Sequence, residues 1–128
     1  MQPIEEFMQE LFLTRIAEEK RVLASRVPYR REFFSSECAW DSRAGSLEMI
    51  ETERIVSVEK IDLGATVITE YNIPAYASGV ETHRRRRYHL KAVNKNWLIW
   101  LVEEECPMCH GHGDENCLFC KGKHWGVN

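Results

Sequence analysis

The first part of the chain has the hydrophobic spacing of an amphipathic helix. From Pro3 to about Val27, apolar side chains recur near one face, while glutamate, lysine and arginine occupy the opposite side. Pro28 ends this pattern, because proline disfavours helical geometry in the residue before it. We therefore predict a long helix over residues 3–27 and a short second helix over Tyr29–Ser35.

The remaining residues up to position 105 alternate with a period of two, which is typical of strands. After a loop over residues 36–46, four segments rich in β-branched and aromatic residues are separated by turn residues. These predicted strands span Leu47–Lys60, Ala65–Ile73, Glu81–Val93 and Trp97–Glu105. Helices followed by a four-strand antiparallel meander predict an α+β domain over residues 1–105.

The last of these segments, Trp97–Glu105, is apolar on both faces of the predicted strand. Strict alternation places three large apolar side chains on each side: Trp97, Ile99 and Leu101 on one, and Leu98, Trp100 and Val102 on the other. Helices can cover only one side of such a sheet, and monomers rarely expose a large contiguous apolar area. We therefore expect a homodimer packed sheet to sheet. A crossing loop or the C-terminal tail over that face is the alternative.

Composition and charge narrow the classes of function. Hydrophobic residues make up 44% of the chain, which is enough to close a core and excludes wholesale disorder. The net charge of −3 gives no general attraction to nucleic acid or to an anionic membrane, so we expect neither as a partner. No apolar stretch reaches the roughly 18 residues of a membrane span, and the start lacks the pattern of a signal peptide. We expect a cytoplasmic protein.

A run of consecutive arginines, residues 84–87, is a local exception to this charge balance. On a strand the run divides between the two faces, with Arg84 and Arg86 on one side and Arg85 and Arg87 on the other. The neighbouring predicted strands contain many glutamates, so we expect cross-strand ion pairs rather than contacts with nucleic acid.

The order of the elements, together with short motifs, carries a family resemblance over roughly residues 3–105. The motifs are Phe33-Phe34 in the short helix, Arg86-x-Tyr88-x-Leu90, and Trp97-Leu98-Ile99. This pattern resembles the nuclear transport factor 2-like superfamily, the cone-shaped α+β fold of polyketide cyclases and ketosteroid isomerase. Membership implies a strongly curved sheet wrapped around the long helix, a pocket between them, and frequent dimerisation through the sheet.

That superfamily includes enzymes and non-enzymes, so site residues must decide the function. Isomerase-like members use an acidic base with an acid–tyrosine pair, and dehydratase-like members use a histidine with an aspartate. Neither set maps onto this chain, because alternation puts Tyr88 and Leu90 on one face and His89 on the other. Aromatic side chains could line the mouth of a pocket or fill the core instead. The candidates are Tyr29, Phe33, Trp40, Tyr71 and Tyr88.

The strongest chemical motif is a pair of Cys-x-x-Cys units near the C-terminus, formed by Cys106 with Cys109 and by Cys117 with Cys120. Without an export signal, such pairs indicate metal binding rather than disulfides. Two cysteines at this spacing direct both thiolates at one cation, and two pairs complete the tetrahedron that zinc prefers. We predict that these four cysteines hold a structural zinc ion in a tail over residues 106–128.

Each unit continues as Cys-x-x-Cys-x-Gly-x-Gly, and the second departs only at its last position. The tail, over roughly residues 106–126, resembles the cysteine-rich zinc domain of DnaJ-type chaperones, of which it would contain two of four repeats. A closed set of four thiolates leaves no open position for water, which argues against a catalytic metal. Replacement of one cysteine by His110, His112 or His124 is the alternative for the ligand set.

Two functional hypotheses follow from these patterns. The first is a non-catalytic binding or protein-interaction module with structural zinc, whose partner is a protein or a small apolar ligand. The alternative is a small-molecule enzyme of the isomerase, dehydratase or cyclase type that uses the cone pocket. A buried His–Asp or Tyr–Asp pair at hydrogen-bond distance would favour the enzyme. A DnaJ-like contact between the tail and unfolded polypeptide is a third, weaker hypothesis.

Overall fold

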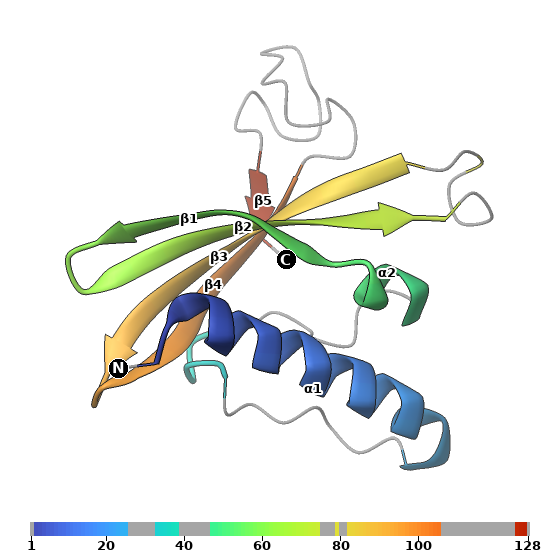
Figure 1. Ribbon diagram of the computed structural model, residues 1–128, viewed down its shortest axis with the longest axis horizontal. Helices are drawn as coiled ribbons and strands as arrows, with labels where there is room; N and C mark the ends of the chain where they lie inside the picture. Colours follow the sequence, from blue (N-terminus) through green and yellow to red (C-terminus); the bar gives the residue numbers. More distant parts are fainter. Residues whose placement is uncertain are drawn as a thin grey trace.

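A long helix packs against one face of an antiparallel sheet, which confirms the predicted α+β class (Figure 1). The computed structural model describes residues 2–25, 33–38, 47–74, 79, 82–105 and 125–127. The elements are α1 (Ile4–Ser25), α2 (Leu47–Glu51), β1 (Arg54–Ile61), β2 (Gly64–Ile73), β3 (Thr82–Val93), β4 (Asn96–Glu105) and β5 (Trp125–Val127). The strands lie in the sheet in chain order, each antiparallel to its neighbour.

Helix α1, Ile4–Ser25, forms where the sequence predicts it, and the predicted end at Val27 lies outside the described residues. Its first turn carries Glu5 and Glu6, whose negative charges interact favourably with the helix N-terminus. The buried side chains recur at helical spacing: Ile4, Phe7, Met8, Leu11, Phe12 and Arg15. Five of these six are apolar, and full burial of each such side chain contributes about 1.5–3 kcal/mol. No described helix is long and apolar enough to cross a membrane.

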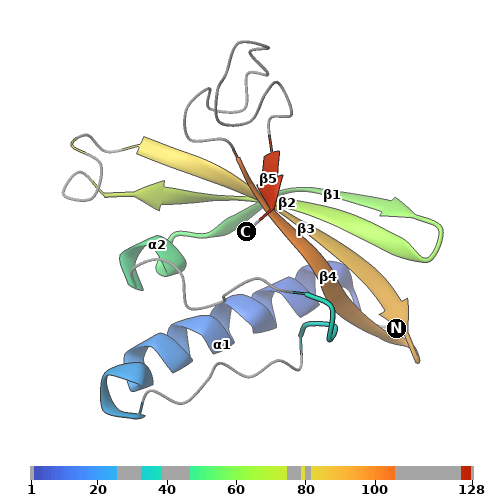
Figure 2. The ribbon, with the colours of Figure 1, turned by 180° about the vertical axis from the view of Figure 1, so that it is seen from behind.

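The core lies between α1 and the face of the sheet that we call the inner face. Strand β2 shows the alternation most clearly, because every second residue from Ala65 to Ile73 is buried. Val67, Tyr88 and Leu90 join the side chains of α1 in one hydrophobic cluster. Helices α1 and α2 both lie on this side of the sheet, as the opposite view also shows (Figure 2). The face that points away from α1 is the outer face.

Two predicted boundaries are wrong. Residues 47–51 form the short helix α2 rather than the start of a strand, and Thr52 ends it by donating its hydroxyl hydrogen bond to the Met49 carbonyl at 2.9 Å. Phe33–Ser35 form a turn and a bridge rather than helix, because the backbone of Phe33 and of Ser35 hydrogen-bonds to Ile99, each at 2.8 Å. Apolar runs this short do not distinguish a helical period from a strand period.

A β-bulge at Trp100 overturns the strict alternation predicted for the last strand. The pairing aligns Leu90 with Ile99 but His89 with Leu101, so β4 carries one extra residue. Ile99 and Val102 are therefore both buried in the core, whereas Trp100 is 39% exposed. After the bulge, the alternation of side chains between the two faces is displaced by one residue.

A further strand follows the cysteine-containing segment. Strand β5 pairs with the end of β4, with Trp125 opposite Glu105 and Val127 opposite Glu103. Within the described residues the sheet therefore has five strands where the sequence predicted four. Because the two strands are antiparallel, residues 105 and 125, on either side of the cysteine-containing segment, are direct partners in the sheet.

Candidate functional site

A cluster of charged and hydroxyl-bearing side chains lies on the inner face, between α1 and the sheet. Its members come from α1, from the α2–β1 junction and from three strands: Arg15, Glu53, Thr69, Tyr71, Arg86, Tyr88 and Glu104. We call this set the buried charge cluster. Strand alternation delivers Tyr88 and Arg86 to it from β3, and the β4 bulge turns Glu104 toward it.

Glu53 is the centre of the buried charge cluster and accepts hydrogen bonds on both carboxylate oxygens. Arg15 and Arg86 donate through Nη1 to Oε1, at 2.6 and 3.0 Å. Thr69 Oγ1 and Tyr88 Oη donate to Oε2, at 2.6 and 2.7 Å. The Glu53 side chain is only 1% exposed and requires such compensation, because an unpaired buried charge is very costly.

The protonation states follow from these contacts. Burial raises the pKa of Glu53, but Arg86, Arg15 and the two hydroxyl donors outweigh burial and hold the pKa below its usual range. Burial and the neighbouring Glu53 carboxylate raise the pKa of Tyr88. At neutral pH Glu53 is therefore ionised and Tyr88 is protonated, so the phenol donates to the carboxylate.

Glu104 forms the second acidic half of the buried charge cluster. Arg86 Nε donates to its Oε1 at 2.5 Å, and Tyr71 Oη donates to its Oε2 at 3.0 Å. The Arg86 guanidinium also lies over the Tyr71 ring, 4.6 Å from its centroid. Burial, with Glu104, raises the pKa of Tyr71 to about 12, against the opposing effect of Arg86. Among the described residues, the cluster therefore sets two arginines against two glutamates.

The Tyr88–Glu53 pair has the residue types of an isomerase-like acid–tyrosine pair, but its chemistry differs. An oxyanion hole needs donors directed at a substrate, and such sites keep a carboxylic acid protonated so that it can donate. Here the ionised Glu53 accepts from Tyr88. Tyr88 is 0% exposed and the Glu53 side chain 1%, so the pair is closed off from the surface. Among the described residues, the pair is enclosed by its own hydrogen-bond partners.

Sequence reasoning singled out two members of this cluster as pocket candidates, Tyr71 and Tyr88, and missed Arg15. A usable signal was present, because Arg15 lies three residues after Phe12 and four after Leu11, on the apolar stripe of α1. A charged side chain at a core-facing position requires a buried counter-charge. Glu53, just before the first strand, is the carboxylate that supplies it.

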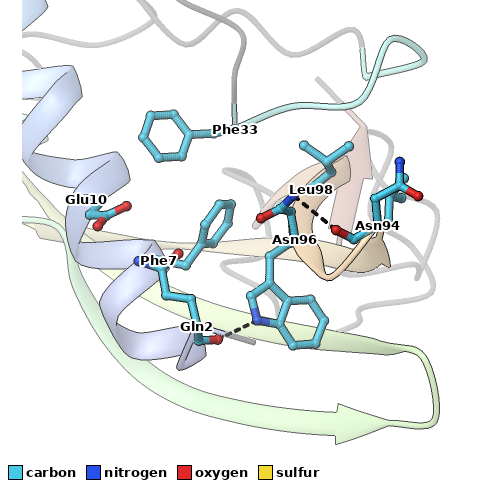
Figure 3. Close-up of a pocket in the computed structure, with 9 residues that line it drawn as sticks. Gln2, Phe7, Glu10, Phe33, Asn94, Asn96 and Leu98 are labelled. Carbon is cyan, nitrogen blue, oxygen red and sulfur yellow. Dashed lines mark hydrogen bonds between the residues drawn. The ribbon is translucent and has the colours of Figure 1, made fainter.

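A groove of about 420 Å³ lies away from the buried charge cluster, beside the start of α1 and the β3–β4 turn (Figure 3). It is lined by Gln2, Phe7, Glu10, Phe33, Val93, Asn94, Asn96, Trp97 and Leu98. The Trp97 indole donates to the Gln2 carbonyl at 2.9 Å, and the Phe7 and Phe33 ring centroids are 5.5 Å apart. Of the sequence candidates Phe33 lines the groove, Tyr71 and Tyr88 belong to the buried charge cluster, and Tyr29 and Trp40 lie outside the described residues.

The outer face carries the other half of the arginine run, which divides between the faces as predicted. Arg87 Nε donates to Glu103 Oε1 at 2.9 Å, and Arg85 lies 3.5 Å from Glu70 Oε2. The predicted cross-strand ion pairs are thus confirmed on both faces. His89 also contacts Glu103. Burial raises the pKa of Glu103, but the hydrogen bonds from Arg87 and His89 hold it below its usual range.

Aromatic side chains flank these outer-face ion pairs. The His89 and Trp100 ring centroids are 5.5 Å apart. The Arg87 guanidinium lies 4.6 Å from the centre of the Trp125 ring, which is a cation–π contact between β3 and β5. The Arg87 side chain therefore links Glu103 of β4 to Trp125 of β5.

The four cysteines of the predicted zinc site lie outside the described residues: Cys106, Cys109, Cys117 and Cys120. Within the described parts of the chain, no group of three or more histidine, cysteine or acidic side chains could hold a metal ion. Cys38 is described, and it is buried in the hydrophobic core. The structure does place the residues on either side of the cysteine segment, because Glu105 and Trp125 are paired across the β4–β5 ladder.

Comparison of the chain with protein-family models, with curated proteins and with solved structures finds no match. The function is therefore argued from the residues and their geometry.

Proposed function

We propose that this protein is a non-catalytic interaction module in which a helix-and-sheet domain carries a structural zinc site at one end of the sheet. The observation that carries the non-catalytic part is the state of the buried charge cluster. Its acid–base side chains, Glu53 and Tyr88, are buried and hydrogen-bonded to each other and to both arginines. Groups held in this way stabilise a core and are not presented to a substrate.

The zinc part of the proposal is supported by the donor set and by the ends of the segment. Four thiolates in two Cys-x-x-Cys units suit a closed tetrahedral zinc site. The pairing of Glu105 with Trp125 holds the two ends of the segment together. This lowers the loss of chain entropy on bringing the two cysteine pairs to one ion. When bound, zinc would supply the folding free energy of a segment too short to form a core.

The finer fold description and the partner belong to the same proposal. We propose a cone-like, nuclear transport factor 2-like arrangement, supported by the element order and by a core that lies between α1 and one sheet face. We also propose a homodimer through the outer face. Its support is the apolar outer part of β4, where Trp100 is exposed and Leu98 and Leu101 are partly exposed.

Native mass spectrometry with metal analysis, on protein purified without chelator, tests this proposal. We expect one zinc ion per chain, and none after the double substitution Cys106→Ser with Cys117→Ser. Cys38→Ala is the matched control, because it removes a cysteine from the core and leaves the predicted ligands intact. Wild-type protein without zinc would overturn the zinc site.

The same spectrum tests the alternative of a small-molecule enzyme. The groove beside Phe33 favours it, because its volume falls within the range of about 300–1,000 Å³ that is usual for ligand pockets. However, Glu10 is the only titratable side chain among the residues that line it, so the described groove holds one acid or base and no partner. A small molecule that co-purifies and is lost in Phe33→Ala would move this alternative to first place.

A further inference from the structure

Strand β5 is fastened to the sheet next to the predicted zinc segment. It has only three residues, Trp125–Val127, and pairs with Glu103–Glu105 of β4. A strand this short has little stability of its own. Its first residue makes a second contact, because the Trp125 ring lies 4.6 Å from the Arg87 guanidinium. Two independent contacts, one with the backbone and one with a side chain, therefore hold the chain immediately beyond the cysteines.

Arg87 is itself held in position to receive the Trp125 ring. Its Nε donates to Glu103 Oε1 at 2.9 Å, and that carboxylate also contacts His89. Glu103 lies on β4, the strand to which β5 is paired. The hydrogen bond to Glu103 does not involve Trp125, and holding the guanidinium in this way lowers the entropy lost when the cation–π contact forms.

The position of this contact couples it to metal binding. Cys106 follows Glu105 directly, and Cys120 precedes Trp125 by only a few residues. A zinc ion bound by both cysteine pairs must bring these two parts of the chain together. Pairing of β5 with β4 does the same, so each event removes chain entropy that the other would otherwise have to remove.

We propose that Trp125 and Arg87 are positioning residues for the zinc site: their contact keeps β5 paired with β4, holds the residues on either side of the cysteine segment together and raises its zinc affinity. This inference rests on the proposed zinc site. Coupling is reciprocal, so zinc must stabilise the pairing of β5 to the same extent. In the metal-free protein the backbone groups of Glu103–Glu105 on the β5 side are therefore exposed to solvent much more often.

Competition for zinc with a chromogenic chelator measures the coupling. We expect Trp125→Ala to lower zinc affinity by about tenfold, because the segment must then be closed without the cation–π contact. Trp125→Phe, which keeps an aromatic ring, should recover most of the affinity. Trp100→Ala is the matched control, since it removes a tryptophan from the same face without touching β5, and its affinity should equal that of the wild type.

A second matched pair tests the arginine. Arg87→Gln removes the contact with Trp125 and should weaken zinc binding by several-fold, up to about tenfold. Arg85→Gln removes the neighbouring outer-face arginine, which pairs with Glu70, and should leave zinc affinity unchanged. The melting temperature of each metal-free variant shows whether β1–β4 are intact. An affinity loss that matches a general loss of stability would contradict a positioning role.

Hydrogen exchange supplies a readout of the reverse direction. Removal of zinc with a chelator should speed exchange of the amides in Glu103–Glu105 and in β5, and leave the centre of β2 unchanged. The outcomes separate the two proposals. Wild-type protein that binds no zinc overturns the proposed function, whereas wild-type protein that binds zinc with the same affinity as Trp125→Ala overturns the inference about Trp125 alone.

Discussion

Glu53 lies on the inner face of the sheet and Glu103 on the outer face. A comparison of the two shows how burial determines what similar contacts contribute to stability. Each is held by one arginine side chain from β3, Glu53 also by Arg15 of α1, and in each case the hydrogen bonds and charges outweigh burial and lower the pKa. The side chain of Glu53 is 1% exposed and accepts from four donors. That of Glu103 is 15% exposed and contacts two.

The difference matters because water can replace a lost partner only on the outer face. The Arg87–Glu103 pair is partly exposed, at 28% and 15%, so solvent screens its charges and its contribution should lie near the upper end of the roughly 0–1 kcal/mol of exposed pairs. Removing one member of a buried pair leaves an uncompensated charge in the core. The free-energy cost of that charge is much larger than the stabilisation that the intact pair provided. The predictions below compare matched substitutions on the two faces, beginning with the largest expected effect.

Replacement of the Glu53 carboxylate should give the largest difference in stability loss between the inner and outer faces. Glu53→Gln leaves Arg15 and Arg86 buried beside a neutral group, and we expect a loss of about 3–5 kcal/mol in the free energy of unfolding. Glu103→Gln should cost less than about 1 kcal/mol. Urea denaturation of both variants measures the contrast, and equal losses would show that burial does not distinguish the two sites.

The pH dependence of stability sharpens the same contrast. The pKa of Glu53 is lower in the folded protein than its ordinary value of 4.5. Its stabilising contribution is therefore complete above about pH 4.5 and is lost as the pH falls toward the folded pKa. The difference in unfolding free energy between wild type and Glu53→Gln should shrink below about pH 4.5. A difference that stays constant down to pH 3 would contradict an ionised Glu53 in the folded state.

Removal of single hydroxyl groups should give smaller losses in the free energy of unfolding, again with the larger loss at the more buried glutamate. Tyr88→Phe deletes the donor to Glu53, and we expect a loss of about 1–2 kcal/mol because no water replaces it. Tyr71→Phe deletes the donor to Glu104, whose side chain is 17% exposed, and about 0.5–1 kcal/mol should be lost. Thermal unfolding of both variants ranks them, and a reversed order would place the weaker hydrogen bond inside the core.

The outer face should respond to a new charge in assembly rather than in stability. Trp100→Glu changes a partly exposed side chain, so the folded chain should lose less than about 1 kcal/mol. If the proposed homodimer packs through this face, the same change should reduce the mass in solution to that of one chain, measured by light scattering. Leu13→Glu, on an exposed position of α1, is the control that should leave the mass unchanged. An unaltered dimer in Trp100→Glu would contradict the sheet-to-sheet arrangement.

Much of the fold could be predicted because single periodicities determine it. The helical stripe up to Phe12 and the alternation of β2 gave α1 and the central strand, and alternation also divided Arg84–Arg87 between the two faces. The predictions are wrong where a tertiary contact, rather than the local sequence pattern, determines the conformation of a residue. Phe33–Ser35 leave the predicted helix to hydrogen-bond with Ile99, and the bulge at Trp100 turns Val102 inward.

The candidate site was predicted only in part. The face on which Arg86 lies and its use in ion pairs followed from strand alternation and charge, whereas the contact between Arg15 and Glu53 joins residues of α1 and the α2–β1 junction. The sequence around Arg15 does not indicate a contact with Glu53, and the sequence around Glu53 does not indicate one with Arg15. The apolar spacing of α1 could have marked Arg15 as a core-facing charge, but no spacing rule identifies which of the many glutamates neutralises it.

The sequence by itself determined the α+β class, the faces of the arginine run and the cysteine spacing that favours zinc, because each depends on residues close together in the chain. Only the tertiary structure decided that Glu53 gathers four donors, that Tyr88 donates to it rather than to a substrate, and that Trp125 returns to β4 beneath Arg87. These contacts join distant residues, and their strength depends on burial, which exists only once the helix has closed over the sheet.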